Sequence, residues 1–456
     1  MKLGSREQMC EMIAKARVAQ KEFEYFNQEQ VDQVVREIGK VVYDNAELLA
    51  RMAVDETGMG VYEDKVVKNR GKAKTIWNDL KDKKSVGIIG REENTGIVLV
   101  AKPIGVIASV TPTTNPIVTP MSNAMFALKG RNSIIIAPHP RAKMCSTHTV
   151  NLINDALKKY NAPENLIQII EEPSIELTNE LMKAADVIVA TGGAAMVKAA
   201  YSSGKPGFGV GPGNVQCIID RDVNFEETVP KIILGRAFDN GIICSGEQSV
   251  IAHEEDYDQI IEIFKKNGSF YVDDPVQKEA LRKVLFVDGF INKDVVGQRP
   301  HKIGEMAGIL IPESVRVLLI EADGIGEADI LCKEKMCPVL ATFKYKDFAE
   351  AVNIVQTNLE YEGKGHSCVI HSNNKEHIEK AGIVLTVSRL VVNQPCSTSA
   401  GGSFFNGFAP TTTLGCGSWG NNSISENFTY KHMINISRIG YYRKDVVVPT
   451  DQEIWG

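Results

Sequence analysis

The sequence predicts an α/β protein with two doubly wound domains, each a parallel sheet with helices on both faces, and a β arm. Three observations predict this class. Short apolar runs alternate with helix-like segments along most of the chain, which is typical of βαβ units. A Gly- and Pro-rich stretch at residues 207–213 separates two such series. The length of 456 residues suits two or three domains of ordinary size.

The first series predicts a domain over residues 1–215. It starts with two helices between residues 6 and 53, because apolar residues recur there at helical spacing. A targeting peptide for a protein shell is the alternative interpretation of this stretch. Strands and helices then alternate. The predicted strands are 97–101, 104–110, a run within 130–140, 166–170 and 187–190, and the predicted helices are 146–160, 175–184 and 194–202.

The second series predicts a domain over residues 216–418. Its predicted strands are 248–252, 315–320, 339–344, 367–371 and 389–393, and its predicted helices are 226–237, 256–267, 276–285, 347–356 and 374–383. Residues 394–427 are rich in Gly, Ser, Thr and Asn, and so long a loop is usually functional or disordered. The tail over 419–456 looks strand-like at 434–448. With the segment at about 88–102 it forms the predicted β arm.

Composition argues against several classes of protein. The net charge of -6 does not fit a general nucleic-acid binder, which needs a basic surface to neutralise phosphates. No apolar run reaches about 18 residues, so we expect no membrane-spanning helix. The N-terminus lacks the apolar core of a signal peptide, and the nine cysteines are scattered without CxxC spacing. We therefore expect a cytoplasmic protein with reduced thiols and no bound metal.

Cys244 is the strongest candidate for a reactive side chain. It lies in the run FDNGIICSGEQS at residues 238–249, where Asp-Asn-Gly predicts a turn between a helix and a strand. Small neighbours in such a loop let a thiol face a cleft, with backbone N–H groups close enough to hold an oxyanion. A small buried apolar residue is the alternative interpretation.

Asn115 lies where sites of α/β proteins usually form. It stands in the run TPTTNP at residues 111–116, directly after a predicted strand of the sheet. Its side-chain amide could donate a hydrogen bond to a carbonyl oxygen. An ordinary turn residue is the alternative.

Three other positions are weaker candidates. A Thr-Gly-Gly run between a strand and a helix suits a phosphate at a helix N-terminus, although a plain βα turn has the same pattern. A histidine beside glycines could accept a proton near neutral pH or could be structural. A glutamate before a strand could be functional or a surface charge. These residues are Thr191, Gly192 and Gly193, His366, and Glu334.

Taken in their order and spacing, these stretches resemble the aldehyde dehydrogenase superfamily, and more closely its CoA-acylating branch. The matching runs are TPTTNP at 111–116, APHPRAK at 137–143, GVGPGNV at 209–215, FDNGIICSGEQSVIA at 238–252, YEGKGHS at 361–367 and the loop 394–420. The resemblance covers nearly the whole chain. It is greatest to branch members that act on succinic semialdehyde, down to the run GGSFFNGFAPTTTLGCGSWGNNSISEN.

The resemblance implies a role for each matching residue. Cys244 is the implied nucleophile, Asn115 and the backbone N–H of Cys244 form the implied oxyanion hole, and His366 lies near the thiol. The implied cofactor-binding residues are Thr111, Pro112, Thr113, His139, Arg141, Thr191, Gly192, Gly193, Gly209 and Glu334. The implied substrate-binding residues are Ser245, Ser397 and Thr398, with Ser399, Ser403 and Arg389 as further candidates.

Gly209 departs from the hydrolytic members of the superfamily, which carry a water-activating glutamate at this position. Glycine cannot act as a base, so a thioester on Cys244 should resist water and await a thiol nucleophile. The thiol of CoA fits, since sulfur attacks thioesters without strong base help. A hydrolytic, CoA-independent enzyme and a non-catalytic scaffold or RNA-binding relative are the alternatives.

The resemblance therefore implies an enzyme that interconverts an aldehyde, CoA and NAD(P)⁺ with an acyl-CoA and NAD(P)H. Succinic semialdehyde and succinyl-CoA are the expected pair, while sulfoacetaldehyde, acetaldehyde and propionaldehyde stay open. The cofactor is NADP or NAD. The resemblance also implies a homodimer or homotetramer joined through the β arm, small-molecule partners alone, and no fused alcohol dehydrogenase domain.

Overall fold

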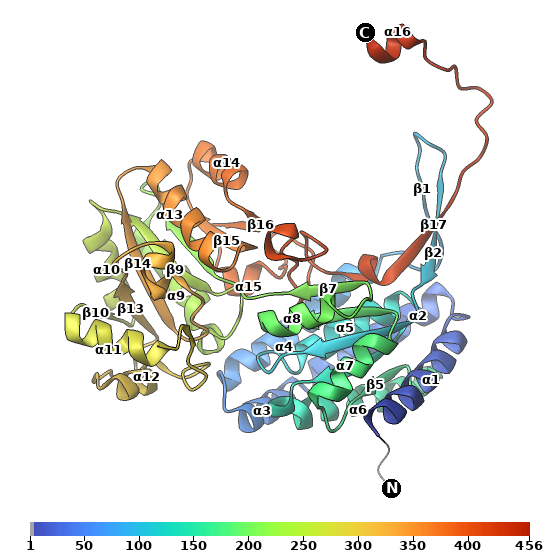
Figure 1. Ribbon diagram of the computed structural model, residues 1–456, viewed down its shortest axis with the longest axis horizontal. Helices are drawn as coiled ribbons and strands as arrows, with labels where there is room; N and C mark the ends of the chain where they lie inside the picture. The colour runs from blue at the N-terminus through green and yellow to red at the C-terminus, as the bar shows by residue number, and fades with distance from the viewer. Residues whose placement is uncertain (1–3) are drawn as a thin grey trace.

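The computed structural model describes residues 4–456 and contains two α/β lobes with a projecting arm (Figure 1). The first sheet has five parallel strands in the order β5-β4-β3-β6-β7. Its strands are β3 (Val106–Thr111), β4 (Ser133–Pro138), β5 (Ile167–Ile169), β6 (Val187–Thr191) and β7 (Gly207–Val210). The strand order reverses between β3 and β6, and ligands of open α/β sheets bind beside such a point at the carboxyl ends of the strands.

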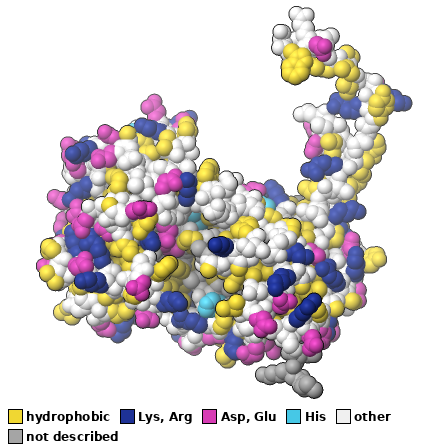
Figure 2. All heavy atoms as spheres, viewed as in Figure 1, with side chains coloured by type: hydrophobic (Ala, Val, Ile, Leu, Met, Phe, Trp, Pro, Cys, Tyr) yellow, Lys and Arg dark blue, Asp and Glu magenta, His cyan; other side chains and the backbone are white. Residues whose placement is uncertain are grey.

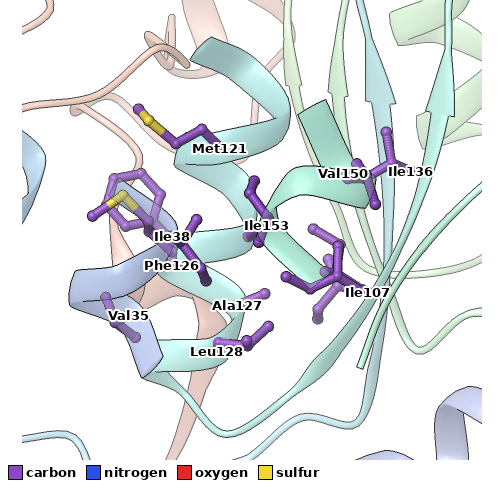
Figure 3. Packing of buried hydrophobic residues seen from close by; sticks show 14 of the residues in the cluster. Val35, Ile38, Ile107, Met121, Phe126, Ala127, Leu128, Ile136, Val150 and Ile153 are labelled. Atoms are coloured by element: carbon purple, nitrogen blue, oxygen red, sulfur yellow. The ribbon is translucent and has the colours of Figure 1, made fainter. Parts of the chain in front are cut away.

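Helices cover both faces of this sheet because its strands are apolar on both faces. In β3, Ile107 faces one core and Val106 and Ala108 face the other, as the alternation of side chains along a strand requires. Helices α2 (Gln28–Asp44), α5 (Val118–Lys129) and α6 (Lys143–Leu157) pack on the first face (Figure 3). Helices α1 (Ser5–Phe23), α7 (Ile175–Ala184) and α8 (Ala194–Tyr201) pack on the other.

The N-terminal region differs from its prediction. Residues 6–53 were expected to form two helices, but Asn45 ends α2 and precedes a third helix, α3 (Ala46–Thr57). The next helix, α4 (Tyr62–Leu80), carries lysines that reach the candidate site. Helix α1 packs on the sheet through Met9, Ile13 and Ala16, which makes it part of the fold.

The second sheet has seven parallel strands in the order β10-β13-β14-β9-β8-β15-β16. They are β8 (Val215–Ile219), β9 (Glu247–His253), β10 (Ser269–Val272), β13 (Val317–Glu321), β14 (Val339–Tyr345), β15 (Gly365–His371) and β16 (Val387–Val392). One face packs against α9 (Phe225–Ala237), α10 (Tyr257–Lys266) and α15 (Cys396–Ser399). The other face packs against α11 (Pro275–Leu285), α12 (Pro300–Ala307), α13 (Phe348–Tyr361) and α14 (Lys375–Val384). Two doubly wound sheets confirm the predicted fold class.

The two lobes are joined twice. The chain leaves β7 at Val210 and enters β8 at Val215, so residues 211–214 form a short first link. After β16 it returns to the first lobe, where the ring of Phe428 lies 6.0 Å from that of Phe126 and 5.2 Å from that of Phe208.

The arm is an antiparallel sheet of β1 (Gly87–Arg91), β2 (Val98–Pro103) and β17 (Ile434–Ile439). The prediction of a strand over 434–448 is wrong beyond Ile439. This residue pairs with Val98, where β2 begins, so no partner strand continues. The rest of the tail extends from the arm with apolar side chains exposed and ends in the short helix α16 (Asp451–Trp455) (Figure 2). Pairing of the arm between subunits stays a prediction.

Across residues 4–456, no helix is both long and apolar enough to span a lipid bilayer.

Candidate active site

Two cavities meet at Cys244. The first, which we call the α4 cavity, has a volume of about 250 Å³ and lies between α4, the segment around Cys244 and the loop after α15. The second, the α8 cavity, has a volume of about 350 Å³ and lies at the carboxyl ends of β3, β4 and β6 beside α8. Asn115, Cys244 and Thr412 are the three lining residues, among those the structure describes, that the two cavities share. A molecule in either cavity can therefore reach the sulfur.

The backbone before Cys244 folds into an unusual turn, which we call the nucleophile loop (residues 238–246). Asp239, Asn240 and Gly241 all have positive φ, at 53°, 51° and 71°. Asp, Asn and Gly are the residues that enter this left-handed region most readily. At the third position only glycine fits, because a Cβ would overlap the guanidinium of Arg236.

Arg236 and Asp239 brace this loop from inside. The guanidinium of Arg236 donates to the carbonyl oxygens of Gly241 (2.7 Å) and Glu247 (2.8 Å), one on each side of Cys244. The carboxylate of Asp239 accepts from Nζ of Lys65 (3.0 Å) and Nζ of Lys68 (2.6 Å), and all three side chains are buried. Burial alone would raise the pKa of Asp239, but the two lysines hold it below its usual value. The loop is thus tied to α4.

Asn115 is oriented by the same lysine. Nζ of Lys68 donates to Oδ1 of Asn115 at 2.9 Å. Because an ammonium group can only donate, the amide oxygen faces Lys68 and Nδ2 is directed away from it. Asn115 lines both cavities together with Cys244, which suits an amide donor beside the sulfur. The N–H of Cys244 donates to no backbone carbonyl within residues 4–456, so it can serve as a second donor.

Gly213 brings three predicted residues together. A Cβ on Gly213 would overlap the carbonyl oxygen of Cys244 and lie 3.2 Å from Cε1 of His366. Its own N–H donates to Oε1 of Glu334 at 3.1 Å. Only a residue without a side chain at this position allows the nucleophile loop, the imidazole and the carboxylate to pack so close together.

The thiol and the imidazole are both held in uncharged forms. Burial first, and then Glu334 and Cys416, raise the pKa of Cys244 to about 12, although Arg389 opposes them. His366 is fully buried and neither ring nitrogen has a hydrogen-bond partner among the described residues. Burial, together with the nearby Arg389, lowers the pKa of His366 to about 3. At neutral pH the site therefore contains a thiol and a neutral imidazole.

The α8 cavity contains most of the predicted cofactor-binding residues. Its lining includes Thr111, Pro112, Thr113, His139, Thr191, Gly192, Gly193 and Glu334. A nicotinamide dinucleotide fits this donor set. The amide groups at the start of α8 suit a pyrophosphate, and the side chain of Glu334 suits ribose hydroxyls. The buried Oγ1 of Thr111 has no hydrogen-bond partner in the described part of the chain. Burial, together with the neighbouring Glu362, raises the pKa of Glu334 to about 8.

Two predicted cofactor residues lie elsewhere. Arg141 is exposed and its guanidinium donates to the carbonyl oxygen of Thr57 at 3.3 Å. Gly209 does not line the cavity, and its N–H donates to the hydroxyl of Tyr201 at 2.9 Å. A Cβ on Gly209 would lie 2.7 Å from Val197 and 2.9 Å from Tyr201. A side chain at this position would thus run into α8.

The α4 cavity contains the predicted substrate residues. Ser245, Ser397 and Thr398 line it, as does Ser403, and the buried hydroxyl of Ser397 has no hydrogen-bond partner among the residues that the structure describes. Ser399 does not line it.

Arg389 forms structural hydrogen bonds and does not line the α4 cavity. Its guanidinium donates to the carbonyl oxygens of His366 (2.7 Å) and Gly415 (2.8 Å), to Oγ of Ser367 (3.0 Å) and to Oδ1 of Asn427 (3.1 Å). The cations of the cavity come from α4 instead.

These α4 cations are Lys68, Lys72 and Lys74. Nζ of Lys72 donates to the carbonyl oxygen of Gly401 at 2.8 Å and forms no ion pair with any carboxylate of the described chain. Sequence reasoning missed these lysines, since α4 carries no motif. The spacing of Lys68 and Lys72, four residues apart and so on one helix face, is the available signal. Thr412 was missed because it lies within a long loop.

Over the described part of the chain, no three His, Cys, Asp or Glu side chains cluster in a way that could hold a metal ion.

Comparison with known proteins gives consistent matches. Residues 1–281 match the Aldehyde dehydrogenase family. The chain is 59% identical over 446 residues to the Succinate-semialdehyde dehydrogenase (acetylating) of Clostridium kluyveri, covering 98% of each chain. It is 43% identical over 451 residues to a Sulfoacetaldehyde dehydrogenase of an Acholeplasma species, covering 97% of this chain and 93% of the other.

Solved structures agree with these matches. An acetylating aldehyde dehydrogenase from Geobacillus thermoglucosidasius superposes with a TM-score of 0.94 at 37% identity, covering 98% of each chain. A propionaldehyde dehydrogenase from Rhodopseudomonas palustris, solved with bound CoA and an acylated cysteine, superposes with a TM-score of 0.85 at 29% identity. It covers 95% of this chain and 97% of the other.

Proposed function

The chain belongs to the aldehyde dehydrogenase family, and on this basis we propose that it is a CoA-acylating aldehyde dehydrogenase whose preferred pair is succinic semialdehyde and succinyl-CoA. The observation that carries this proposal is the position of Cys244. Its thiol lies where two cavities meet, beside the amide of Asn115, so one cavity can hold the aldehyde while the other holds the cofactor.

Cys244 supplies the nucleophile. As a thiolate, its sulfur adds to the aldehyde carbonyl carbon, and the carbonyl oxygen becomes an oxyanion. Nδ2 of Asn115 and the N–H of Cys244 are the donors that stabilise this charge. One such donor commonly changes the rate by about 10²–10³. We assign the role of accepting the thiol proton to His366, whose neutral ring approaches Gly213 where that glycine contacts the backbone carbonyl of Cys244.

A bound nicotinamide cofactor supplies the acceptor for the hydride of the aldehyde carbon. The residues that would hold it are those of the α8 cavity. The amide groups of Gly192 and Gly193 would hold its pyrophosphate, and Glu334 would bind a ribose. Once the hydride has left, Cys244 carries the acyl group as a thioester.

The thioester is then transferred to CoA. The CoA thiolate attacks the acyl carbon, the bond to Cys244 breaks, and the cysteine leaves as a thiolate. Water lacks a carboxylate to activate it, because Glu334 is the one acidic side chain lining either cavity in residues 4–456 and would be engaged by the ribose of a bound cofactor. The relatives from Clostridium kluyveri and Geobacillus thermoglucosidasius, both named as acetylating enzymes, support this step.

The α4 cavity favours an aldehyde with an anionic tail. Lys72 and Ser397 both line it, and among residues 4–456 Lys72 has no carboxylate partner and the hydroxyl of Ser397 has no hydrogen-bond partner. Two donors of this kind suit the carboxylate of succinic semialdehyde. The sulfonate of sulfoacetaldehyde is the second candidate, since the Acholeplasma relative carries that name.

We propose the domain assignment together with this function. Residues 1–215 bind the cofactor, residues 216–418 carry the nucleophile, and residues 419–456, with the segment at about 88–102, form an arm that joins a homodimer or homotetramer. A cytoplasmic location fits the nine cysteines, each of which is free.

Incubation of the purified protein with succinyl-CoA and each reduced cofactor tests the proposal. We expect oxidation of NADH or NADPH together with release of free CoA, and no turnover by Cys244→Ala. Oxidation of the aldehyde to free succinate at the same rate without CoA would contradict it.

Lys72→Met tests the choice of substrate. A charged hydrogen bond is worth about 1.5–3 kcal/mol, so we expect KM for succinic semialdehyde to rise about 10- to 100-fold. KM for butyraldehyde, which is similar in length but neutral, should change little and serves as the control. Burial lowers the pKa of Lys72 to about 8, so in the wild type KM for the anionic aldehyde should rise above that pH. An equal change for both aldehydes would assign Lys72 to structure alone.

A further inference from the structure

The ammonium group of Lys68 makes three contacts. Nζ lies 2.6 Å from Oδ2 of Asp239, 2.9 Å from Oδ1 of Asn115 and 3.4 Å from the carbonyl oxygen of Thr114. An ammonium group has three hydrogens, so each has an acceptor and none is left free. The lysine side chain is only 7% exposed, which keeps water from competing for these acceptors.

We propose that Lys68 is a positioning residue for the oxyanion hole: its ammonium fixes the orientation of the Asn115 amide and strengthens the amide as a donor. The inference rests on the proposed function, in which Asn115 stabilises the oxyanion. Lys68 itself touches neither the substrate oxygen nor the sulfur in this scheme.

Orientation follows from hydrogen-bond chemistry. A carboxamide has an oxygen end and a nitrogen end of nearly the same shape, and it can rotate by half a turn to exchange them. A donor-only partner at 2.9 Å accepts only one of the two orientations, the one with Oδ1 toward Lys68. The other orientation would place two N–H groups against a buried cation. Lys68 thereby keeps Nδ2 toward the cavities that hold Cys244.

The positive charge of Lys68 strengthens the Asn115 amide as a hydrogen-bond donor. A cation on the amide oxygen draws electron density toward that oxygen, and hydrogen bonds in a chain polarise one another in the same sense. The N–H groups of Nδ2 then carry more positive charge and bind a developing oxyanion better. This gain appears in the transition state, when the carbonyl oxygen becomes charged, and contributes little to binding of the neutral aldehyde.

The same lysine also links the two lobes at the site. Asn115 follows β3 of the first sheet, and Asp239 belongs to the nucleophile loop before β9 of the second sheet. Lys68 holds both, so it fixes the amide of Asn115 relative to the N–H of Cys244. The two donors of the oxyanion hole come from different lobes and need such a bridge.

Lys65 provides a matched control. Its Nζ pairs with the same Oδ2 of Asp239 at 3.0 Å and its side chain is 3% exposed, but it makes no hydrogen bond with Asn115. Lys65→Met and Lys68→Met each leave Asp239 with one lysine. The two variants therefore differ chiefly in whether the amide keeps its cation.

Steady-state and single-turnover kinetics of Lys68→Met, Lys65→Met, Asn115→Ala and the double variant Lys68→Met/Asn115→Ala test the inference. We expect Lys68→Met to lower kcat and the acylation rate about 10- to 100-fold, with KM for NAD(P)H and the acyl-CoA within a factor of about two. Lys65→Met should retain most of the rate. In the Asn115→Ala background, Lys68→Met should lower kcat and the acylation rate no further, because the amide through which Lys68 acts is absent.

Three results would overturn the inference: a normal rate in Lys68→Met, an equal loss in Lys65→Met, or the same fold-loss with and without Asn115. Thermal unfolding of each variant checks that the folded enzyme is compared. If Lys68→Met does not fold, Lys68→Arg is measured in the same two backgrounds. Arginine keeps the charge beside Asp239 but changes the donor geometry at Asn115. The rate lost on Lys68→Arg should therefore disappear in the Asn115→Ala background. The same fold-loss of rate with and without Asn115 would overturn the inference. Wild-type enzyme without CoA-acylating activity would instead refute the proposed function.

Discussion

Cys244 occupies surroundings that oppose its ionisation. Burial removes water from the sulfur, and the neighbouring Glu334 also raises the pKa of the thiol. Arg389 is the cation that opposes them, but its donors are engaged by carbonyl groups and neutral side chains. The nucleophile must therefore lose its proton during the reaction cycle, when a bound aldehyde brings the oxyanion donors and His366 into use.

The pH dependence of alkylation tests this feature. With the pKa of Cys244 at about 12, the thiolate fraction should rise about tenfold for each pH unit between 7 and 10. The rate of iodoacetamide labelling of the free enzyme, followed by mass spectrometry of the Cys244 peptide, should rise in the same way. Free cysteine, with a pKa near 8.5, is the reference and levels off within this range. A plateau for Cys244 near pH 8.5 would contradict the prediction.

At the scale of elements, the connection from α9 to β9 sets the position of the nucleophile. It contains three consecutive residues with positive φ, and such a turn needs support because left-handed backbone is unfavourable for most residues. Arg236 gives this support from α9 by reaching across the loop to Gly241 and Glu247. The guanidinium is fully buried and has no carboxylate partner within 4.0 Å among the described residues.

Replacement of Arg236 should weaken the folded state. Arg236→Met leaves two buried carbonyl oxygens without donors, each at a cost of about 1–3 kcal/mol, so we expect the free energy of unfolding to fall by about 2–5 kcal/mol. Urea unfolding measures it. Arg236→Lys can keep one of the two hydrogen bonds and should fall between Met and the wild type. A loss below about 0.5 kcal/mol in Arg236→Met would show that the loop does not depend on this side chain.

At the scale of the whole molecule, β15 crosses the core of the second lobe and carries two buried histidines. His366 and His371 are fully buried, and no ring nitrogen of either has a hydrogen-bond partner in residues 4–456. Burial lowers the pKa of both to about 3. The folded chain thus keeps them neutral, whereas the unfolded chain protonates them below about pH 6.5.

Stability should consequently fall with acid. Between about pH 6.5 and 3 the unfolded chain binds protons at these two sites that the folded chain does not, so the free energy of unfolding decreases as the pH is lowered. Thermal or urea unfolding over this range measures the slope. His371→Asn removes one of the two sites and should make the slope shallower. An unchanged slope in this variant would contradict the assignment.

The prediction of the fold from the sequence succeeded where apolar runs were short and clearly bounded. Strands such as β4 and β13 are buried on both faces, and their continuous apolar runs were sufficient to find them. Helix α5 was missed because all of its residues are buried, which leaves no polar face to produce a helical period. The tail beyond Ile439 was overestimated, because strand propensity does not reveal whether a partner strand is present.

The site was predicted in the same uneven way. Sequence runs marked Cys244, Asn115 and Glu334, which the structure places on the walls of adjoining cavities. They did not mark Lys68 or Lys72, because surface and buried lysines of a helix look alike in sequence. The direction of a side chain at position 209 likewise depends on how β7 pairs and on where α8 packs, and the sequence around position 209 predicts neither.

The link over residues 211–214 limits how this protein can be recombined with its relatives. It is the shortest passage between the lobes, yet Gly211 and Pro212 line the α8 cavity and Gly213 touches the nucleophile loop. A chimaera that exchanges one lobe at this junction cuts through the catalytic centre and must match both parents there. The two sheets and the link over residues 211–214 should therefore be exchanged together. Cofactor preference is better transferred by substituting single residues of the α8 cavity than by exchanging one lobe.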